Sequence, residues 1–164
     1  MKLSVYVEVK DRGWEAVAFD LMGAPADLSP EQVSLTAFLG ERQVPRYVRS
    51  LESIAGGIHL VTDPIYYNGD FRMEIAGTQT SFSKKDVPLD AVHVKNLDKF
   101  EARREGDVIY RLYSPQASGP RPLLLFLHGG GECGYDNVLQ MTRTQAALHM
   151  AESNPHLKDM APQA

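Results

Sequence analysis

The chain has 164 residues, of which 43% are hydrophobic and 23% are charged, ordinary values for a soluble globular protein. The net charge is -4 and the acidic and basic residues are interleaved, so electrostatics gives no reason to expect nucleic acid or an anionic membrane as partner. The longest apolar run, residues 123–127, is far shorter than the about 20 residues that cross a bilayer. The sequence therefore indicates a soluble protein that binds neither nucleic acid nor a membrane.

The single cysteine, Cys133, excludes an internal disulfide. This fits a reducing compartment, and the cytoplasm is the expected location. A secreted protein without disulfides, its signal peptide removed, would have the same composition. Residues 2–9 alternate polar and apolar side chains, unlike the unbroken apolar region of a signal peptide.

Alternation of polar and apolar residues dominates the first hundred positions and predicts short strands separated by turns. Residues 3–9 and 14–21, joined by Asp11-Arg12-Gly13, predict a hairpin or a crossing from one sheet to another. One helical turn is expected at Ser29-Pro30-Glu31-Gln32. Further strands are predicted at residues 33–39, 47–54, 58–61 and 71–75, with Asp63-Pro64 ending the third of these. Strands at this spacing predict a β-sandwich. The sequence lacks the Cys…Trp…Cys pattern of antibody domains, so an immunoglobulin-like sandwich without a disulfide remains open.

The character of the sequence changes beyond the predicted sandwich. Residues 77–90 are rich in Thr, Ser, Lys and Pro and predict a long loop or linker, and residues 100–103 and 107–113 predict two more strands. Residues 123–127 are continuously apolar, as expected of a strand covered on both faces in a mainly parallel sheet. A Gly-rich loop follows, then a predicted helix over residues 138–152 and a short strand over 157–161. This order predicts the first βαβ portion of an α/β domain.

The Gly-rich loop, residues 128–137, is the segment whose sequence indicates a catalytic role. Successive glycines after a buried strand let backbone N–H groups approach a substrate closely. Acyl transfer needs such donors where the oxygen of the tetrahedral intermediate becomes negative. Two alternatives are a plain strand-to-helix turn and a phosphate-binding loop, since Gly129, Gly131 and Gly134 form a nominal Gly-x-Gly-x-x-Gly string. The sequence supplies no acidic residue after a second strand to bind a ribose, and an oxyanion loop is the preferred interpretation.

The sequences on either side of this loop make its identification more specific. Tyr110 to Pro115, Pro122 to Asn137 and Ala161-Pro162-Gln163 together resemble the opening of the α/β-hydrolase domain in poly-hydroxybutyrate-depolymerase-like and related bacterial carboxylesterases. The resemblance runs from about residue 98 to the C-terminus. Some members of that group carry an N-terminal immunoglobulin-like domain, which matches the β-rich first half of this chain.

The resemblance implies roles for particular residues. Three match the oxyanion loop itself, with the second as the donating amide: Gly129, Gly130 and Gly131. Four match positions that organise the loop through side-chain contacts with its backbone: His128, Glu132, Asp136 and Asn137. The nucleophile, acid and base of these serine esterases follow later in that order, and no Gly-x-Ser-x-Gly occurs in this sequence. The chain is therefore expected to be truncated before its nucleophile and to be inactive alone.

The predicted fold is mostly β: an immunoglobulin-like β-sandwich over residues 1–95, then an N-terminal fragment of an α/β-hydrolase core, its first βαβ portion, over residues 96–164. The expected function is that of the N-terminal part of a serine carboxylesterase, whose full enzyme takes a small acyl-ester substrate. The alternative is an immunoglobulin-like binding or oligomerisation module without catalysis. Exposed edge strands of a sandwich can pair between subunits, and a homo-oligomer is expected.

Several other features have simple structural interpretations. No cofactor and no metal is expected, because the histidines lack partners at metal-ligand spacing. Cys133 is interpreted as an ordinary loop cysteine and not as a nucleophile paired with His128 or His149. Six aromatic residues would suit a carbohydrate-binding platform but are expected mainly in the core: Tyr6, Trp14, Phe19, Tyr47, Tyr66 and Tyr67. The apolar strand at residues 123–127 is predicted to be covered by another copy of the chain.

Overall fold

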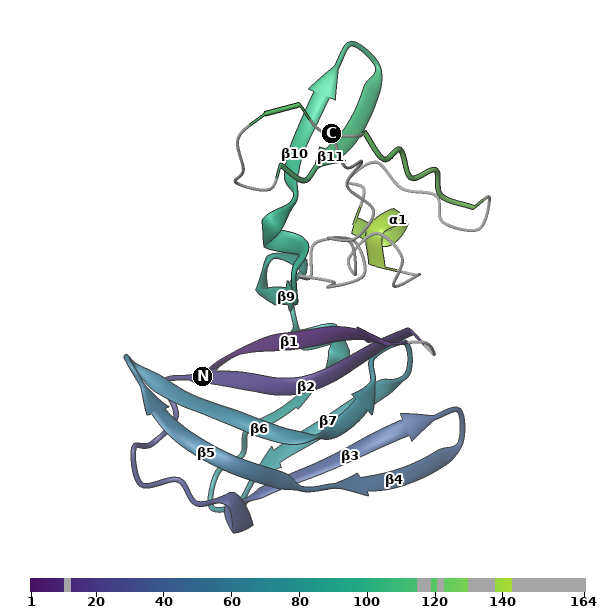
Figure 1. Ribbon diagram of the computed structural model, residues 1–164. Coiled ribbons are helices and arrows are strands. Elements are labelled where there is room, and N and C mark those ends of the chain that lie inside the picture. Colours follow the sequence, from purple (N-terminus) through teal and green to yellow (C-terminus); the bar gives the residue numbers. More distant parts are fainter. Residues whose placement is uncertain (11–12, 115–118, 121–122, 130–137, 143–164) are drawn as a thin grey trace. The chain divides into compact units, whose positions relative to one another are not determined.

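The computed structural model describes residues 1–10, 13–114, 119–120, 123–129 and 138–142 (Figure 1). These residues are mostly in β-strands, with short 3-10 turns and one short helix. The chain divides into two compact units, Met1–Lys95 and Asn96–Ala164, which are described one after the other.

The first unit contains a five-stranded sheet with the order β5-β6-β2-β1-β9. Its strands are β1 (Lys2–Lys10), β2 (Gly13–Met22), β5 (Val48–Ile54), β6 (Gly57–Tyr66) and β9 (Val92–Val94). The neighbouring strands are antiparallel, except that β9 lies parallel to β1.

A four-stranded antiparallel sheet has the order β4-β3-β7-β8. Its strands are β3 (Val33–Leu39), β4 (Arg42–Arg46), β7 (Asp70–Ile75) and β8 (Ser81–Ser83). Three 3-10 turns join elements of this unit: η1 (Pro30–Gln32), η2 (Lys84–Asp86) and η3 (Leu89–Ala91). The chain passes from one sheet to the other at Tyr47, between β4 and β5 (Figure 1).

The hydrophobic core lies between these two sheets. Alternate residues of β1, among them Val5 and Val7, are buried, and so are the alternate residues of β7. Phe19 of the five-stranded sheet meets Phe71 of the four-stranded sheet edge to face, with ring centroids 5.3 Å apart. Because the side-chain period of a strand is 2, this pattern places one apolar face of each sheet in the core. The first unit is therefore a two-layer β-sandwich.

Several predicted elements are confirmed at or near their expected bounds. These are the hairpin of β1 and β2 and the strands β3, β5 and β7. The predicted helical turn is η1, in which the side-chain oxygen of Gln32 accepts a hydrogen bond of 2.8 Å from the N–H of Ser29. Strand β4 was not predicted, because its sequence is polar and its side chains are mostly exposed at the edge of the sheet.

The predicted end of a strand at Asp63-Pro64 is wrong, since β6 continues through both residues to Tyr66. The pairing of β2 with β6 shifts register here: Ala18 pairs with Val61, whereas Ala16 pairs with Ile65. A proline is tolerated at such an irregularity because it displaces no ladder hydrogen bond.

The predicted linker at residues 77–90 is also wrong in part, because this stretch contains β8 and two 3-10 turns. Two apolar side chains within the polar sequence, Phe82 and Val87, are buried in the sandwich core. The N–H of Ser83 donates to the Asp86 carboxylate at 2.8 Å and stabilises the first turn. Isolated apolar residues in a Ser- and Lys-rich stretch are a weak signal in sequence, but here they anchor the segment.

The second unit begins with η4 (Leu97–Lys99) and a hairpin of β10 (Glu101–Glu105) and β11 (Val108–Leu112), which confirms the two predicted strands. The rings of Phe100 and Tyr113 lie 5.4 Å apart at the open end of this hairpin. The helix α1 (Val138–Thr142) is the short described part of the predicted helix. Residues 143–164, with the predicted final strand, lie outside the described residues.

The strand predicted at residues 123–127 is not present. Residues 123–129 carry no strand assignment, and the side chains of Leu123, Leu124, Leu125 and Leu127 are between 64% and 85% exposed in the single chain. A buried parallel strand needs strands beside it and helices over its faces. Among the described residues of the second unit, the elements are 3-10 turn η4, hairpin β10–β11 and helix α1. The predicted βαβ portion is therefore not found in the part of the chain that the structure describes.

Candidate functional site

Of the predicted oxyanion loop, His128 and Gly129 are described. The other predicted loop residues lie outside the described part of the chain: Gly130, Gly131, Glu132, Asp136 and Asn137. The exposed ring of His128 places Nδ1 2.9 Å from the carbonyl oxygen of Gly129, a contact between the side chain and the backbone of its own loop. A Cβ built on Gly129 would meet no described atom within 4 Å. The predicted roles of all seven residues stay predictions.

A cluster of polar side chains lies on the outer face of the five-stranded sheet, on strands β1, β2, β6 and β9. The hydroxyl of Tyr6 donates to Asp20 Oδ2 at 2.7 Å, and His59 Nδ1 lies 2.6 Å from Asp20 Oδ1. The Tyr6 ring stacks on His93, with centroids 4.9 Å apart, and meets His59 edge-on at 5.4 Å. The contacts of Tyr6 and Asp20 thus link strands β1, β2, β6 and β9.

The electrostatics of this cluster follow from the shared carboxylate. The hydrogen bond to Asp20, together with burial, raises the pKa of Tyr6 from 10.0 to about 12, so the phenol is a neutral donor at physiological pH. Asp20 also fixes the orientation of the His59 ring, which resembles the pairing of acid and base in hydrolytic sites. No hydroxyl of a described serine or threonine is hydrogen-bonded to His59. The arrangement therefore has no nucleophile among the described residues.

Sequence analysis did not predict this cluster. Alternation places Tyr6, Asp20 and His59 on outward-facing positions of their strands, but it does not give the register between strands. In the structure Asp20 pairs directly with His59, while Tyr6 pairs with Ala18 and His93. Only that register brings the side chains together.

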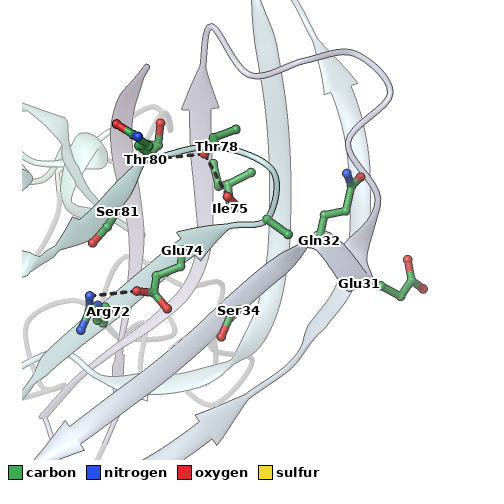
Figure 2. Close-up of a pocket in the computed structure, with 11 residues that line it drawn as sticks. Glu31, Gln32, Ser34, Arg72, Glu74, Ile75, Thr78, Thr80 and Ser81 are labelled. Carbon is green, nitrogen blue, oxygen red and sulfur yellow. Dashed lines mark hydrogen bonds and ion pairs between the residues drawn. The ribbon is translucent and has the colours of Figure 1, made fainter.

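A cavity of about 470 Å³ lies at one end of the four-stranded sheet, beside the turn between β7 and β8 (Figure 2). The Arg72 guanidinium and the Glu74 carboxylate form an ion pair of 2.9 Å along its wall. The turn is ordered by the Thr78 hydroxyl, which donates to the carbonyl of Ile75 at 2.9 Å and accepts from the N–H of Thr80 at 3.1 Å. These groups offer hydrogen bonds to a small polar molecule but include no nucleophile activated by a base.

The six aromatic residues considered for a carbohydrate-binding platform do not form a single surface. Phe19 and Tyr67 are buried in the core, and Trp14 stacks on Tyr67 with ring centroids 6.2 Å apart. Tyr47, in contrast, is 63% exposed where the chain changes sheets. The aromatic residues are therefore divided between the core and separate surface positions, and the expectation that they lie mainly in the core is met by Phe19 and Tyr67, with Trp14 packed against it.

Two searches of the described residues bear on other classes of site. They contain no group of three or more His, Cys, Asp or Glu side chains placed to hold a metal ion. None of their helices has both the length and the apolar character needed to traverse a bilayer.

Comparison with known proteins gives one informative result. No protein-family model and no curated protein matches the sequence. A solved structure of a thermostable esterase matches 98% of this chain and 55% of its own, with a TM-score of 0.56 and 19% sequence identity. The chain thus spans about half the length of that esterase. At this identity the similarity establishes a shared fold.

Proposed function

We propose that this chain is the N-terminal part of a serine carboxylesterase that hydrolyses acyl esters. In this proposal residues 1–95 are an immunoglobulin-like domain and residues 96–164 are the first segment of an α/β-hydrolase core. The observation that carries the proposal is the structural similarity to an esterase, which extends over 98% of the chain and so includes both of its units. The sequence of the loop at residues 128–137 supports it independently, because its His-Gly-Gly-Gly segment suits the stabilisation of an oxyanion.

In the proposed reaction a serine hydroxyl attacks the acyl carbonyl while a histidine takes the hydroxyl proton. The carbonyl π electrons move to the oxygen, which becomes an oxyanion. The amide of Gly130 and the amide after the nucleophile donate hydrogen bonds to that oxygen. Collapse of the intermediate expels the alcohol, which takes the proton from histidine, and water then releases the acid. This chain contributes the Gly130 donor, and the nucleophile, acid and base are expected elsewhere.

The proposal is tested on the polypeptide that extends this chain through a Gly-x-Ser-x-Gly segment and the acid and histidine that follow it. We expect it to hydrolyse p-nitrophenyl butyrate, and we expect the Ser→Ala variant of that segment to abolish the reaction. Gly130→Pro removes the donating N–H and is expected to lower kcat by about 10²–10³, the effect of losing one oxyanion donor. Cys133→Ala is the matched control in the same loop and should leave kcat unchanged. An inactive extended polypeptide, or equal loss in both variants, would refute the proposed role of the loop.

The alternative function, a binding or oligomerisation module without catalysis, is favoured by one feature of the sandwich. Strand β5 is a long edge strand of the five-stranded sheet. Such an edge can form contacts between subunits whether or not the chain takes part in catalysis.

A further inference from the structure

The two sheets of the sandwich end in four edge strands, and three of them are protected. Strand β4 carries Pro45 and begins and ends with an arginine, a composition that discourages pairing. Strands β8 and β9 have three residues each, and the N–H of Ser83 in β8 is already bonded to the Asp86 carboxylate. Strand β5, by contrast, has seven residues and no proline. Among the four edge strands of the sandwich it is the long one that carries no proline.

The main chain of β5 has groups that face away from its neighbour β6. Ile54 and Gly57 pair across a two-residue turn, in which Gly56 adopts a φ of 79°. In such a hairpin the two residues that flank the turn are hydrogen-bonded to each other, and hydrogen-bonded pairs then alternate with pairs that are not. Leu51 and Ser53 belong to the pairs that are not, so their N–H and C=O groups point outward. Turn η1 lies near β5, but no backbone hydrogen bond found outside the sheets of the described residues reaches Leu51 or Ser53.

The side chains of β5 divide between the two faces of the sheet. Leu51 pairs with the buried Leu60 and packs against the core, while remaining partly exposed. Ser50 and Glu52 pair with Val61 and His59, belong to the outer face and are exposed. A strand added beside β5 would therefore cover Leu51 on one face and meet Ser50 and Glu52 on the other.

We propose that β5 pairs with β5 of a second copy of this chain, antiparallel and about a two-fold axis at Leu51. The outward backbone groups of Leu51 then bond to the partner's Leu51, and Ser53 lies opposite the partner's Arg49, the position at which the pairing of β5 with β6 shifts register. On the outer face Ser50 lies opposite the partner's Glu52. The two five-stranded sheets become one continuous sheet, and the half-exposed leucines meet at the join between the two cores.

The charges of the strand select this register over its two symmetric neighbours. Centring the axis on Glu52 would place two carboxylates directly opposite each other, which is unfavourable. Centring it on Ser50 would place Leu51 opposite the partner's Arg49, whose guanidinium is needed for the ion pair of 2.5 Å with Asp63. Only the Leu51-centred register matches apolar with apolar and leaves no like charges opposed. This register makes the strand self-complementary.

A dimer held by one pair of strands buries less than the about 1,600 Å² of a standard interface, so its association should be weak and concentration-dependent. The test is sedimentation equilibrium of the full 164-residue chain from about 1 μM to about 1 mM, the range in which weak interfaces dissociate. The chain has a mass of 18.2 kDa, and we expect the weight-average mass to rise toward twice that value. A constant monomer mass across the series would overturn the proposal.

Two sets of variants test the surface and its register. Ser53→Pro removes an outward N–H without touching the pairing to β6, whereas Ser53→Thr keeps that N–H and is the matched control. We expect the proline variant to stay monomeric and the threonine variant to dimerise, with an unchanged circular dichroism spectrum in both. Dimers that survive Ser53→Pro would overturn the proposed interface.

The register is tested by exchanging charges across the axis. Ser50→Glu places a new carboxylate opposite the partner's Glu52, and we expect it to prevent dimerisation. Adding Glu52→Lys to the same chain places opposite charges in both symmetric pairs and should restore the dimer. If the double variant stays monomeric, or if Ser50→Glu dimerises normally, the Leu51-centred register is wrong. These measurements report mass alone, so their outcome is separate from that of the esterase proposal.

Discussion

Replacement of Phe71 by alanine tests whether the two sheets share the core described above. Phe71 is 1% exposed and contacts Phe19, which is 0% exposed, across the space between the sheets. Truncation of a buried phenylalanine typically costs about 3–5 kcal/mol, because transfer free energy is lost and a cavity remains. A domain of this size is stable by about 5–15 kcal/mol in total, so Phe71→Ala removes a large share of the free energy of unfolding. We expect the variant to unfold at a much lower urea concentration.

Urea unfolding followed by tryptophan fluorescence measures this effect, because Trp14 is the chain's single tryptophan and packs against the sandwich core. The control is Leu89→Ala, at a leucine that is 91% exposed, and its free energy of unfolding should change by less than about 0.5 kcal/mol. A double-mutant cycle with Phe19→Leu and Phe71→Leu isolates the ring contact, for which we expect a coupling of about 0.5–1.5 kcal/mol. A loss below about 1 kcal/mol for Phe71→Ala with no coupling in the cycle would refute the shared core.

Three further predictions concern titration and activity. In Asp20→Asn the hydrogen bond that raises the pKa of Tyr6 is weakened, so the ¹³C NMR titration of Tyr6 should move from a midpoint of about 12 toward 10.0; an unmoved midpoint would exclude Asp20 as the cause. The stability from this contact is present below pH 10.0 and is lost as pH rises through about 12. Hydrogen bonds from Lys10 and Lys95 lower the pKa of Glu8 from 4.5, so its contribution to stability is present above pH 4.5 and is lost as pH falls through the lowered value. Glu8→Gln should therefore be less stable than the wild type at neutral pH but equally stable in acid, and parallel pH profiles of urea midpoints would contradict this. The purified 164-residue chain should not hydrolyse p-nitrophenyl butyrate, and turnover that Cys133→Ala abolishes would show that a cysteine nucleophile had been wrongly dismissed.

The fold of the first unit was largely predictable because strand periodicity is a local property. Val5 and Phe71 each lie in a run where apolar and polar residues alternate, and each is buried as that pattern predicts. The prediction failed where local preference and tertiary context disagree. Pro64 ends a strand in isolation but is accommodated at a register shift of β6, and Phe82 anchors a stretch whose composition is that of a linker.

The clustered side chains were less predictable, because they depend on pairing between strands far apart in sequence. Asp20 and His59 are separated by 39 positions, and they meet only through the register of β2 with β6. At residues 123–127 a local pattern predicted a strand that the structure does not show. A continuously apolar run forms a buried strand only when other segments supply strands beside it and helices over its faces. The described residues of the second unit do not supply them, and the run is exposed.

The most direct test of the esterase proposal is the reading frame downstream of codon 164, together with the activity of its product. The proposal predicts a Gly-x-Ser-x-Gly segment followed by an acid and a histidine, and hydrolysis of p-nitrophenyl butyrate that depends on that serine. A reading frame that ends without such a serine, or an extended polypeptide that folds but does not hydrolyse the ester, would contradict it.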